Sequence, residues 1–478
     1  MKVSKVAFVF ALALTVLLAP GWAVSAQGGI GGTWNSGFQI QNIGENTASV
    51  TIEYYDEDGT CVLTDTVSIP AGSNVNVYPP GDYTDTELAP GKYSVVLISS
   101  EPIAAVANSV NIASQVGDSY LGSEAGNQQV YAPLIYRNYS SYTSIIYAQN
   151  ATLSSQDITV ALYRVGESTP AVSKTYSGVP RYATQEINLG SSDFSGFGST
   201  YGSAIISGGS GDIAVVVVSN RQPGSNLAEL VHLEYRGISA SFAGKHFFAP
   251  LVFKNHNGWD SGVNLQNTES LTTTVSITYT ASSLSSAYPL VKTGSMQLGP
   301  NAGGVFYLPR PDMNGLGENL PDGFFGGVEL SSDTADILAI VNGVNYRGSS
   351  AVGSSYEALN PAVATDSIAG PLIFRGWADT ETGINIQNAG NASTDVTLTI
   401  SKAQGAPTEG GSGPWTFEIT DIGPGEAATF YLPTLMPSIS KLYGSATIAS
   451  TDNVPIAAVI NSPAYARGLS ANYVGINY

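Results

Sequence analysis

Four copies of one pattern constrain this chain more than any single residue does. The fullest copy runs from Phe247 to Asn267 and reads Phe-Phe-Ala-Pro-Leu-Val-Phe-Lys-Asn, then Trp-Asp-Ser-Gly-Val-Asn-Leu-Gln-Asn after a short gap. All copies close on a Gln-Asn pair, whose asparagines are Asn42, Asn150, Asn267 and Asn388. These lie roughly 110 to 120 residues apart, a domain-sized interval, so the chain is a tandem array of domains, each with its own core.

Each copy then repeats the same order of strand signals. Segments 48–55, 158–163, 274–279 and 395–400 alternate apolar with polar residues, which is typical of half-buried strands. Segments 103–108, 213–218, 337–342 and 456–461 are nearly all apolar, as in central strands covered on both sides. Helical periodicity is missing, so we predict an all-β fold of four tandem antiparallel β-sandwich domains of immunoglobulin-like type, each of about 110 residues, without the usual cysteine pair.

The expected domain boundaries follow the copies. A signal peptide covers 1–26, and the four β-sandwich repeats cover 27–122, 130–243, 246–359 and 368–478. Because only short segments separate the repeats, we expect a semi-rigid rod or arc.

The N-terminal segment predicts export. Lys2 and Lys5 precede an apolar run over 6–18, and small residues at 23–26 offer a cleavage site. No later apolar run reaches about 18 residues, so no membrane insertion is expected. We therefore predict a secreted protein that is extracellular or associated with the cell surface.

The net charge of the chain argues against two classes of binding partner. The formal net charge is −19. Nucleic acid and anionic lipid need clustered Lys and Arg, so neither is an expected partner.

The layout of the mature chain resembles the tandem β-sandwich repeats of bacterial surface-layer, sheath and adhesin proteins. It implies a structural or adhesive role, and the motifs are too generic to assign a specific family.

An aromatic residue recurs shortly before each Gln-Asn pair. These residues are Trp34, Tyr142, Trp259 and Trp377. Two interpretations are open: each ring plugs one end of its own sandwich, or the four rings stack on the sugars of a polysaccharide. The Gln-Asn pair itself is interpreted as a turn former, because an Asn amide can satisfy the backbone groups of a loop.

Evidence for metal binding or catalysis is weak. Asp56 and Asp58 resemble part of a calcium loop but lack its closing Glu, so a solvated turn is the alternative and calcium the one possible cofactor. The spacing of the three histidines matches no zinc motif. Because no nucleophile elbow, P-loop or dinucleotide fingerprint occurs, we predict that the protein is not an enzyme.

The first repeat differs from the others. Repeats two to four begin with Pro-Leu-Ile or Pro-Leu-Val, and the predicted mature chain lacks this strand before Trp34. An exposed sheet edge invites pairing with another chain, so one hypothesis is head-to-tail assembly of copies of this protein. The donor residues would be Tyr473, Val474, Ile476 and Tyr478; the alternative is a first repeat that manages with one strand fewer.

Repetition supplies length or avidity, so two functions fit the sequence. The first is a secreted, non-enzymatic structural protein of a bacterial cell surface, which assembles into an envelope layer, sheath or filament. The alternative is an adhesin or polysaccharide-binding protein that uses the repeated Trp and Tyr loops.

Overall fold

The structure is a computed structural model of the whole chain, the predicted leader included. It describes all residues except 1–7, 17–29, 31, 85, 112, 125–126, 223, 225–228, 310–319, 347–350, 408–410, 465–468 and 471. For residues 8–16 it describes the backbone alone.

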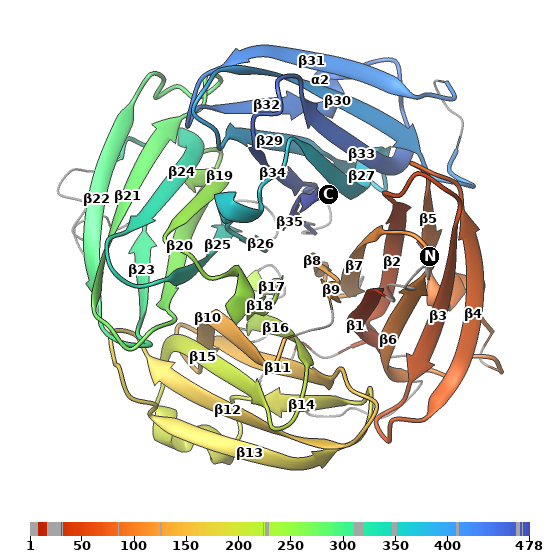
Figure 1. The fold of residues 1–478 in the computed structure, drawn as a ribbon, viewed down its shortest axis with the longest axis vertical. Coiled ribbons are helices and arrows are strands. Elements are labelled where there is room, and N and C mark those ends of the chain that lie inside the picture. The colour runs from red at the N-terminus through yellow and green to blue at the C-terminus, as the bar shows by residue number, and fades with distance from the viewer. Residues whose placement is uncertain are drawn as a thin grey trace, which may run out of the picture.

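The predicted all-β class is confirmed. The described strands pair antiparallel in eight sheets, and Figure 1 shows them as four units around a central axis. Two sheets face each other in each unit, in the manner of a β-sandwich. The described helices are one or two turns long: α1 (Pro79–Asp82), η1 (Ser192–Phe197), η3 (Ala240–Phe242), η5 (Pro361–Val363) and α2 (Leu432–Leu435).

One sheet of each repeat, here called the rim sheet, carries the alternating strands to the outside of the ring (Figure 1). In repeat 1 its order is β4 (Cys61–Ile69), β3 (Ala48–Tyr55), β6 (Gly91–Ser99), β1 (Phe8–Val16) and β9 (Ser123–Glu124). In repeat 2 it is β13 (Val172–Val179), β12 (Gln156–Arg164), β15 (Thr200–Gly208), β10 (Gln129–Arg137) and β18 (Ile238–Ser239). In repeat 3 it is β22 (Val291–Leu298), β21 (Thr273–Ala281), β24 (Phe324–Ser332) and β19 (His246–Lys254). In repeat 4 it is β31 (Trp415–Ile422), β30 (Thr394–Lys402), β33 (Leu442–Ser450), β27 (Ser367–Trp377) and β28 (Thr380–Glu381), and β36 (Ile476–Asn477) also pairs with β27.

The other sheet, here called the hub sheet, ends on a strand beside the axis (Figure 1). In repeat 1 its order is β5 (Asn74–Val77), β2 (Asn35–Asn42), β7 (Ile103–Asn111) and β8 (Val116–Leu121). In repeat 2 it is β14 (Thr184–Asn188), β11 (Tyr142–Asn150), β16 (Ile213–Arg221) and β17 (Val231–Arg236). In repeat 3 it is β23 (Gly303–Tyr307), β20 (Trp259–Asn267), β25 (Ile337–Asn345) and β26 (Val352–Glu357). In repeat 4 it is β32 (Ala427–Tyr431), β29 (Gly383–Asn388), β34 (Ile456–Asn461) and β35 (Asn472–Val474).

Sequence pattern explains where each strand lies. In β12 the side chains of Ile158, Val160 and Leu162 are buried between more exposed neighbours, as alternation predicts for a strand with one solvated face. β16 lies between β11 and β17 in its sheet. Its apolar run is buried on both faces, as its composition predicts.

The Asn of each Gln-Asn pair is a turn former, as predicted. Asn42 Nδ2 donates to the carbonyls of Asn46 and Ile69, and Asn42 Oδ1 accepts from the N–H of Gly44. Asn150, Asn267 and Asn388 make the same three kinds of bond. One buried amide therefore satisfies the backbone groups of each loop.

The repeats meet head to tail. Val216 and Val218, in the hub sheet of repeat 2, pack into the core of repeat 1. Val106 and Leu121, in the hub sheet of repeat 1, pack into the core of repeat 4. Gln39 Nε2 also donates to the carbonyl of Gly444 in repeat 4 at 2.9 Å.

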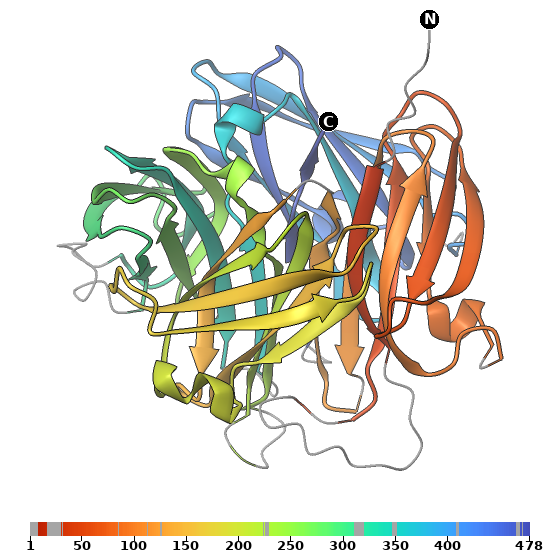
Figure 2. The same ribbon diagram turned by 60° about the horizontal axis from the view of Figure 1, so that its bottom comes forward.

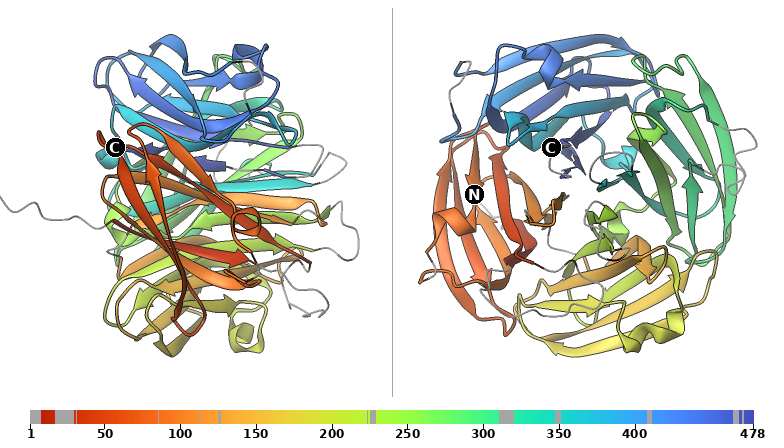
Figure 3. Two further views of the ribbon diagram at one scale, coloured as in Figure 1. Left: turned by 90° about the vertical axis from the view of Figure 1, so that its right-hand side faces the viewer. Right: turned by 180° about the vertical axis from the view of Figure 1, so that it is seen from behind.

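The expected rod or arc is therefore wrong, because the same hub-to-rim contact closes into a ring (Figures 1 and 2). Seen from the side and from behind, the four units form one layer around the axis (Figure 3). Short linkers limited the distance between repeats, but only the angle at each interface decided between a rod and a closed ring.

The Pro-Leu strands lie at these interfaces. β10, β19 and β27 each carry a register shift at the Pro-Leu step. A tyrosine from the last hub strand satisfies the backbone there: Tyr235, Tyr356 and Tyr473 donate their hydroxyls to the carbonyls of Leu134, Leu251 and Leu372. The same leucines return a hydrogen bond from their N–H groups to the tyrosine oxygens.

In repeat 1 the corresponding place is taken by β1, which pairs with β6 along its whole length. The edge predicted to be exposed is thus covered in the full chain, by residues of the predicted leader. The rest of that leader, 1–7 and 17–26, lies outside the described residues, so its cleavage stays a prediction.

At the axis one carboxylate joins all four repeats. Asp118 is buried, and its Oδ1 accepts hydrogen bonds from the N–H groups of Ser119 at 2.9 Å and Asn472 at 3.4 Å. Its Oδ2 accepts hydrogen bonds from the backbone N–H groups of Glu234 at 2.9 Å and Ser355 at 3.2 Å. Each of these four donors directly precedes the tyrosine of its own last hub strand, which is Tyr120, Tyr235, Tyr356 or Tyr473. The donors therefore converge because the ring closes. Burial raises the pKa of Asp118, the Glu234 N–H lowers it, and the nearby Glu234 carboxylate raises it further.

Candidate binding site

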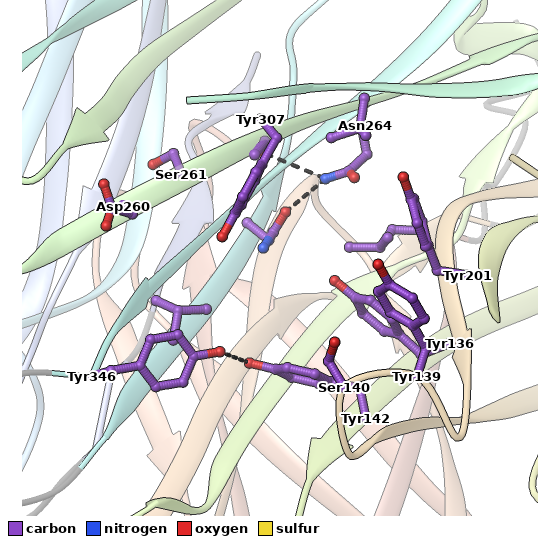
Figure 4. Close-up of a pocket in the computed structure, with 15 residues that line it drawn as sticks. Tyr136, Tyr139, Ser140, Tyr142, Tyr201, Asp260, Ser261, Asn264, Tyr307 and Tyr346 are labelled. Carbon is purple, nitrogen blue, oxygen red and sulfur yellow. Dashed lines mark hydrogen bonds between the residues drawn. The ribbon is translucent and has the colours of Figure 1, made fainter. Parts of the chain in front are cut away.

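A pocket of about 290 Å³ opens between repeats 2 and 3. Six of its lining residues are tyrosines: Tyr136, Tyr139, Tyr142, Tyr201, Tyr307 and Tyr346. Figure 4 shows these rings around the opening, with Asp260, Ser261 and Asn264 beside them. The pocket is therefore aromatic on its walls and polar at a few points, which is the usual composition of a small-ligand site.

Repeat 2 supplies the first group of rings. Tyr136 is the next-to-last residue of β10, Tyr142 begins β11, and their rings stack with centroids 4.8 Å apart. Tyr139, in the turn between these strands, packs on Tyr201 of β15 at 5.0 Å. The turn from β10 to β11 therefore brings together rings from the rim sheet and the hub sheet of repeat 2.

Repeat 3 supplies the opposite wall. Tyr307 ends β23 and Tyr346 follows β25, and the two residues are 41% and 51% exposed, so each is partly covered by protein. The hydroxyls of Tyr142 and Tyr346 lie 2.6 Å apart, so a hydrogen bond ties the two repeats together across the pocket (Figure 4). Arg221 lies over the Tyr346 ring at 5.1 Å.

Amide groups provide the polar part of the pocket. Asn264 Nδ2 donates to Asn342 Oδ1 at 2.7 Å, which leaves the Asn342 amino group for a ligand oxygen. Asp260 Oδ1 accepts from the N–H of Asn255 at 2.8 Å and so is held at the edge of the site. These groups can both donate to and accept from a hydroxyl-rich ligand.

Four of the pocket phenols, those of Tyr136, Tyr142, Tyr201 and Tyr346, are neutral at physiological pH. Burial raises the pKa of Tyr136, Tyr142, Tyr201 and Tyr346 above the ordinary value of 10.0. For Tyr142 the neighbouring Tyr346 raises the pKa further. Each of these four hydroxyls therefore keeps its proton and can donate a hydrogen bond.

Of the four predicted stacking residues, only Tyr142 lines this pocket. Trp34 is buried at the junction with repeat 2, where its ring lies 4.5 Å from that of His232 and its Nε1 donates to the Ile30 carbonyl. Trp259 is buried against Phe253. Neither indole can stack on a sugar, because its faces are already covered by protein.

Trp377 remains partly exposed, and its ring packs on Tyr443 at 5.0 Å. The sequence pattern grouped Trp377 with Trp34, Tyr142 and Trp259, but strand pairing shows that it is not equivalent to them. Tyr139 forms an isolated β-bridge with Tyr142, and His256 forms one with Trp259. Trp377 pairs in the same way with Thr380. Trp377 therefore corresponds to Tyr139 and His256, and four equivalent aromatic loops do not form.

The predicted calcium residues form a turn. Asp56 Oδ1 accepts from the N–H groups of Asp58 and Thr60 at 3.0 and 2.8 Å. Within the part of the chain that the structure describes, no three His, Cys, Asp or Glu side chains come together to hold a metal ion.

The C-terminal segment is engaged within its own chain. Tyr473 and Val474 are buried in β35, and Ile476 pairs with Ala369 of β27. The Tyr478 N–H donates to the Ser367 carbonyl. These contacts hold the proposed donor segment inside the ring, so it is not available to a second copy.

No helix among the described residues is long and apolar enough to cross a membrane.

Comparisons with known proteins leave the family open. No protein-family model matches the chain, and no curated protein matches it significantly. The solved structure of Thermotoga maritima 1070 is 10% identical, over 24% of this chain and 92% of that one, with a TM-score of 0.20. The Anabaena sensory rhodopsin transducer is 23% identical over 22% and 95%, with a TM-score of 0.16. A tetra-tandem repeat from the extending region of a large adhesion protein is 11% identical over 93% and 95%, with a TM-score of 0.11. Similarity this weak assigns neither family nor activity.

Sequence reasoning missed Tyr139, Tyr201, Tyr307 and Tyr346. The chain contains 26 tyrosines, so tyrosine alone gave no signal. Tyr307 and Tyr346 reach Tyr139 and Tyr201 only because the hub sheet of repeat 3 packs on the rim sheet of repeat 2.

Proposed function

We propose that this chain is a secreted, non-enzymatic adhesin or polysaccharide-binding protein of a bacterial cell surface. The observation that supports this proposal is the tyrosine pocket between repeats 2 and 3. Its rings line a concave opening beside the Asn264 and Asn342 amides.

A neutral sugar unit suits this chemistry best. A pyranose ring presents C–H faces that pack on aromatic rings, and hydroxyls that bond to amides, phenols and carboxylates. An acidic sugar would meet the Asp260 carboxylate in a chain of net charge −19, which is unfavourable. The ring of repeats acts as a rigid scaffold, because both walls are fixed by packed sheets.

Binding is tested by titrating neutral and acidic oligosaccharides into the protein by calorimetry. Tyr139→Ala and Tyr307→Ala each remove one exposed ring from the pocket, and an aromatic contact contributes about 0.5–1.5 kcal/mol, so each should weaken binding roughly 3- to 10-fold. Tyr288→Ala is the control, since Tyr288 is exposed and does not line the pocket. Binding that is equally strong in both pocket variants would contradict the site.

A second candidate function is a structural protein that assembles with its own copies into an envelope layer, sheath or filament. The observation in its favour is β1, which belongs to the predicted leader and covers the edge of β6. Cleavage at the predicted site would open this edge to a strand from another copy. Electron microscopy of residues 27–478, with and without millimolar calcium, tests it: filaments or sheets support assembly, and single rings under both conditions reject it.

A further inference from the structure

The tyrosine pocket belongs to a pattern that recurs around the ring. In repeats 2, 3 and 4 an aromatic residue at or just after the end of the Pro-Leu strand touches an aromatic residue at the second position of the neighbouring rim strand. The three pairs are Tyr139 with Tyr201, His256 with Phe325, and Trp377 with Tyr443, with ring centroids 5.0, 4.5 and 5.0 Å apart. Strand register confirms the equivalence, because Tyr136, Phe253 and Phe374 pair with Tyr201, Phe325 and Tyr443.

The facing hub sheet repeats a second group. A glycine stands opposite an asparagine, and a tyrosine lies on the other side of the glycine: Gly262, Asn342 and Tyr307 in repeat 3; Gly383, Asn461 and Tyr431 in repeat 4; Gly37, Asn108 and Tyr78 in repeat 1. A Cβ at Gly262 or Gly383 would lie 2.9 or 2.8 Å from the asparagine Oδ1, so glycine is what leaves room for the amide. All three tyrosines are exposed.

The strands that carry these two groups meet at three junctions. Between repeats 2 and 3 they form the pocket itself. Between repeats 3 and 4, β24, which carries Phe325, contacts β32, which carries Tyr431. Between repeats 4 and 1, the residues after Tyr443 bond across the junction: Gly444 accepts from Gln39 and Ser445 bonds to Asn74.

The junction between repeats 1 and 2 breaks the pattern. Ile145 pairs with Val218 and Asn188, so the glycine, asparagine and tyrosine are all replaced. On the rim side, β1 pairs with β6 without a register shift. Three junctions, and not four, therefore carry both groups.

We infer that the protein has three quasi-equivalent binding sites for one class of ligand, a neutral pyranose unit, placed at the 2/3, 3/4 and 4/1 junctions. This inference rests on the proposed function. Each site combines a rim pair of rings with a hub tyrosine and amide. Sites fixed on one rigid ring let a polysaccharide be held at several points, so binding to the polymer is tighter than to a single unit.

The experiment is native mass spectrometry with the neutral oligosaccharide that binds most tightly in calorimetry, together with retention on the corresponding polysaccharide. Wild type is expected to bind up to three oligosaccharides. Trp377→Ala removes a ring from the 4/1 site and Tyr431→Ala from the 3/4 site; each should lower the count by one and reduce polymer retention about tenfold. Neither should change affinity at the tyrosine pocket, and Tyr288→Ala should change nothing.

The outcomes separate the two proposals. One bound oligosaccharide, lost in the Tyr139→Ala/Tyr307→Ala double variant, keeps the proposed function and overturns the three-site inference. No binding at all overturns both. Three bound oligosaccharides in wild type, and one fewer in each of Trp377→Ala and Tyr431→Ala, support both proposals.

Discussion

Replacing Asp118 tests whether one side chain holds the ring closed. Asp118→Ala removes a carboxylate that accepts hydrogen bonds from backbone N–H groups of all four repeats. The N–H groups it bonds lie among buried residues, so they would be left without this acceptor. A hydrogen bond to a charged group contributes about 1.5–3 kcal/mol, but part of that is offset because the buried carboxylate no longer has to be desolvated. We expect a net loss of about 3–5 kcal/mol, because each buried N–H group left without an acceptor costs about 1–3 kcal/mol and the relief of desolvation offsets part of the sum.

The assay is urea unfolding followed by circular dichroism. Asp118→Asn should cost about half as much, because one oxygen is kept while the new amino group faces N–H donors. Asp157→Ala is the matched control: that exposed carboxylate accepts from the single N–H of Gly178 and should cost about 1 kcal/mol. Formate should restore part of the lost stability to Asp118→Ala and not to Asp157→Ala, because it can occupy the space of the missing carboxylate.

The reasoning is refuted if Asp118→Ala unfolds within about 1 kcal/mol of wild type. It is also refuted if formate stabilises both alanine variants equally, because the effect would then not be located at the axis.

Two further predictions concern the tyrosines. Tyr356→Phe removes a buried hydroxyl that donates to the Leu251 carbonyl and accepts from the Leu251 N–H, so it should lower the free energy of unfolding by about 1–3 kcal/mol. Tyr288→Phe, at an exposed site, should leave the free energy of unfolding unchanged. Equal melting temperatures for the two variants would contradict this prediction. Burial raises the pKa of Tyr235, Tyr356 and Tyr473 in the folded state, so their contribution to stability is present below pH of about 10, the unfolded pKa, and is lost as pH rises above it. Their phenolate absorbance at about 295 nm should appear only together with unfolding, and titration of all tyrosines near pH 10 with an intact circular dichroism spectrum would reject this account.

Local chemistry explains what could be predicted from the sequence. The strands, their burial and the turns after Asn42, Asn150, Asn267 and Asn388 depend on neighbouring residues, and alternation and amide bonding decide them. The all-β class followed from the same patterns.

The candidate site depended on residues far apart in sequence. Tyr142 was predicted as a stacking residue and lines the pocket, but its partner Tyr346 lies in the next repeat. Trp34 and Trp259 were predicted to share its role and are buried instead, because the packing between sheets covers their rings. A sequence motif records which residues recur and not which faces stay open.

By itself the sequence determined a tandem array of β-sandwiches, because strand periodicity and turn chemistry act within a few residues. Only the tertiary structure decided that the array closes, that Asp118 meets a backbone N–H from every repeat, and that tyrosines of two repeats enclose one pocket. The physical reason is that closure depends on the angle at each hub-to-rim interface. That angle is set by side chains more than a hundred residues apart, whose contacts leave no periodic trace in the chain.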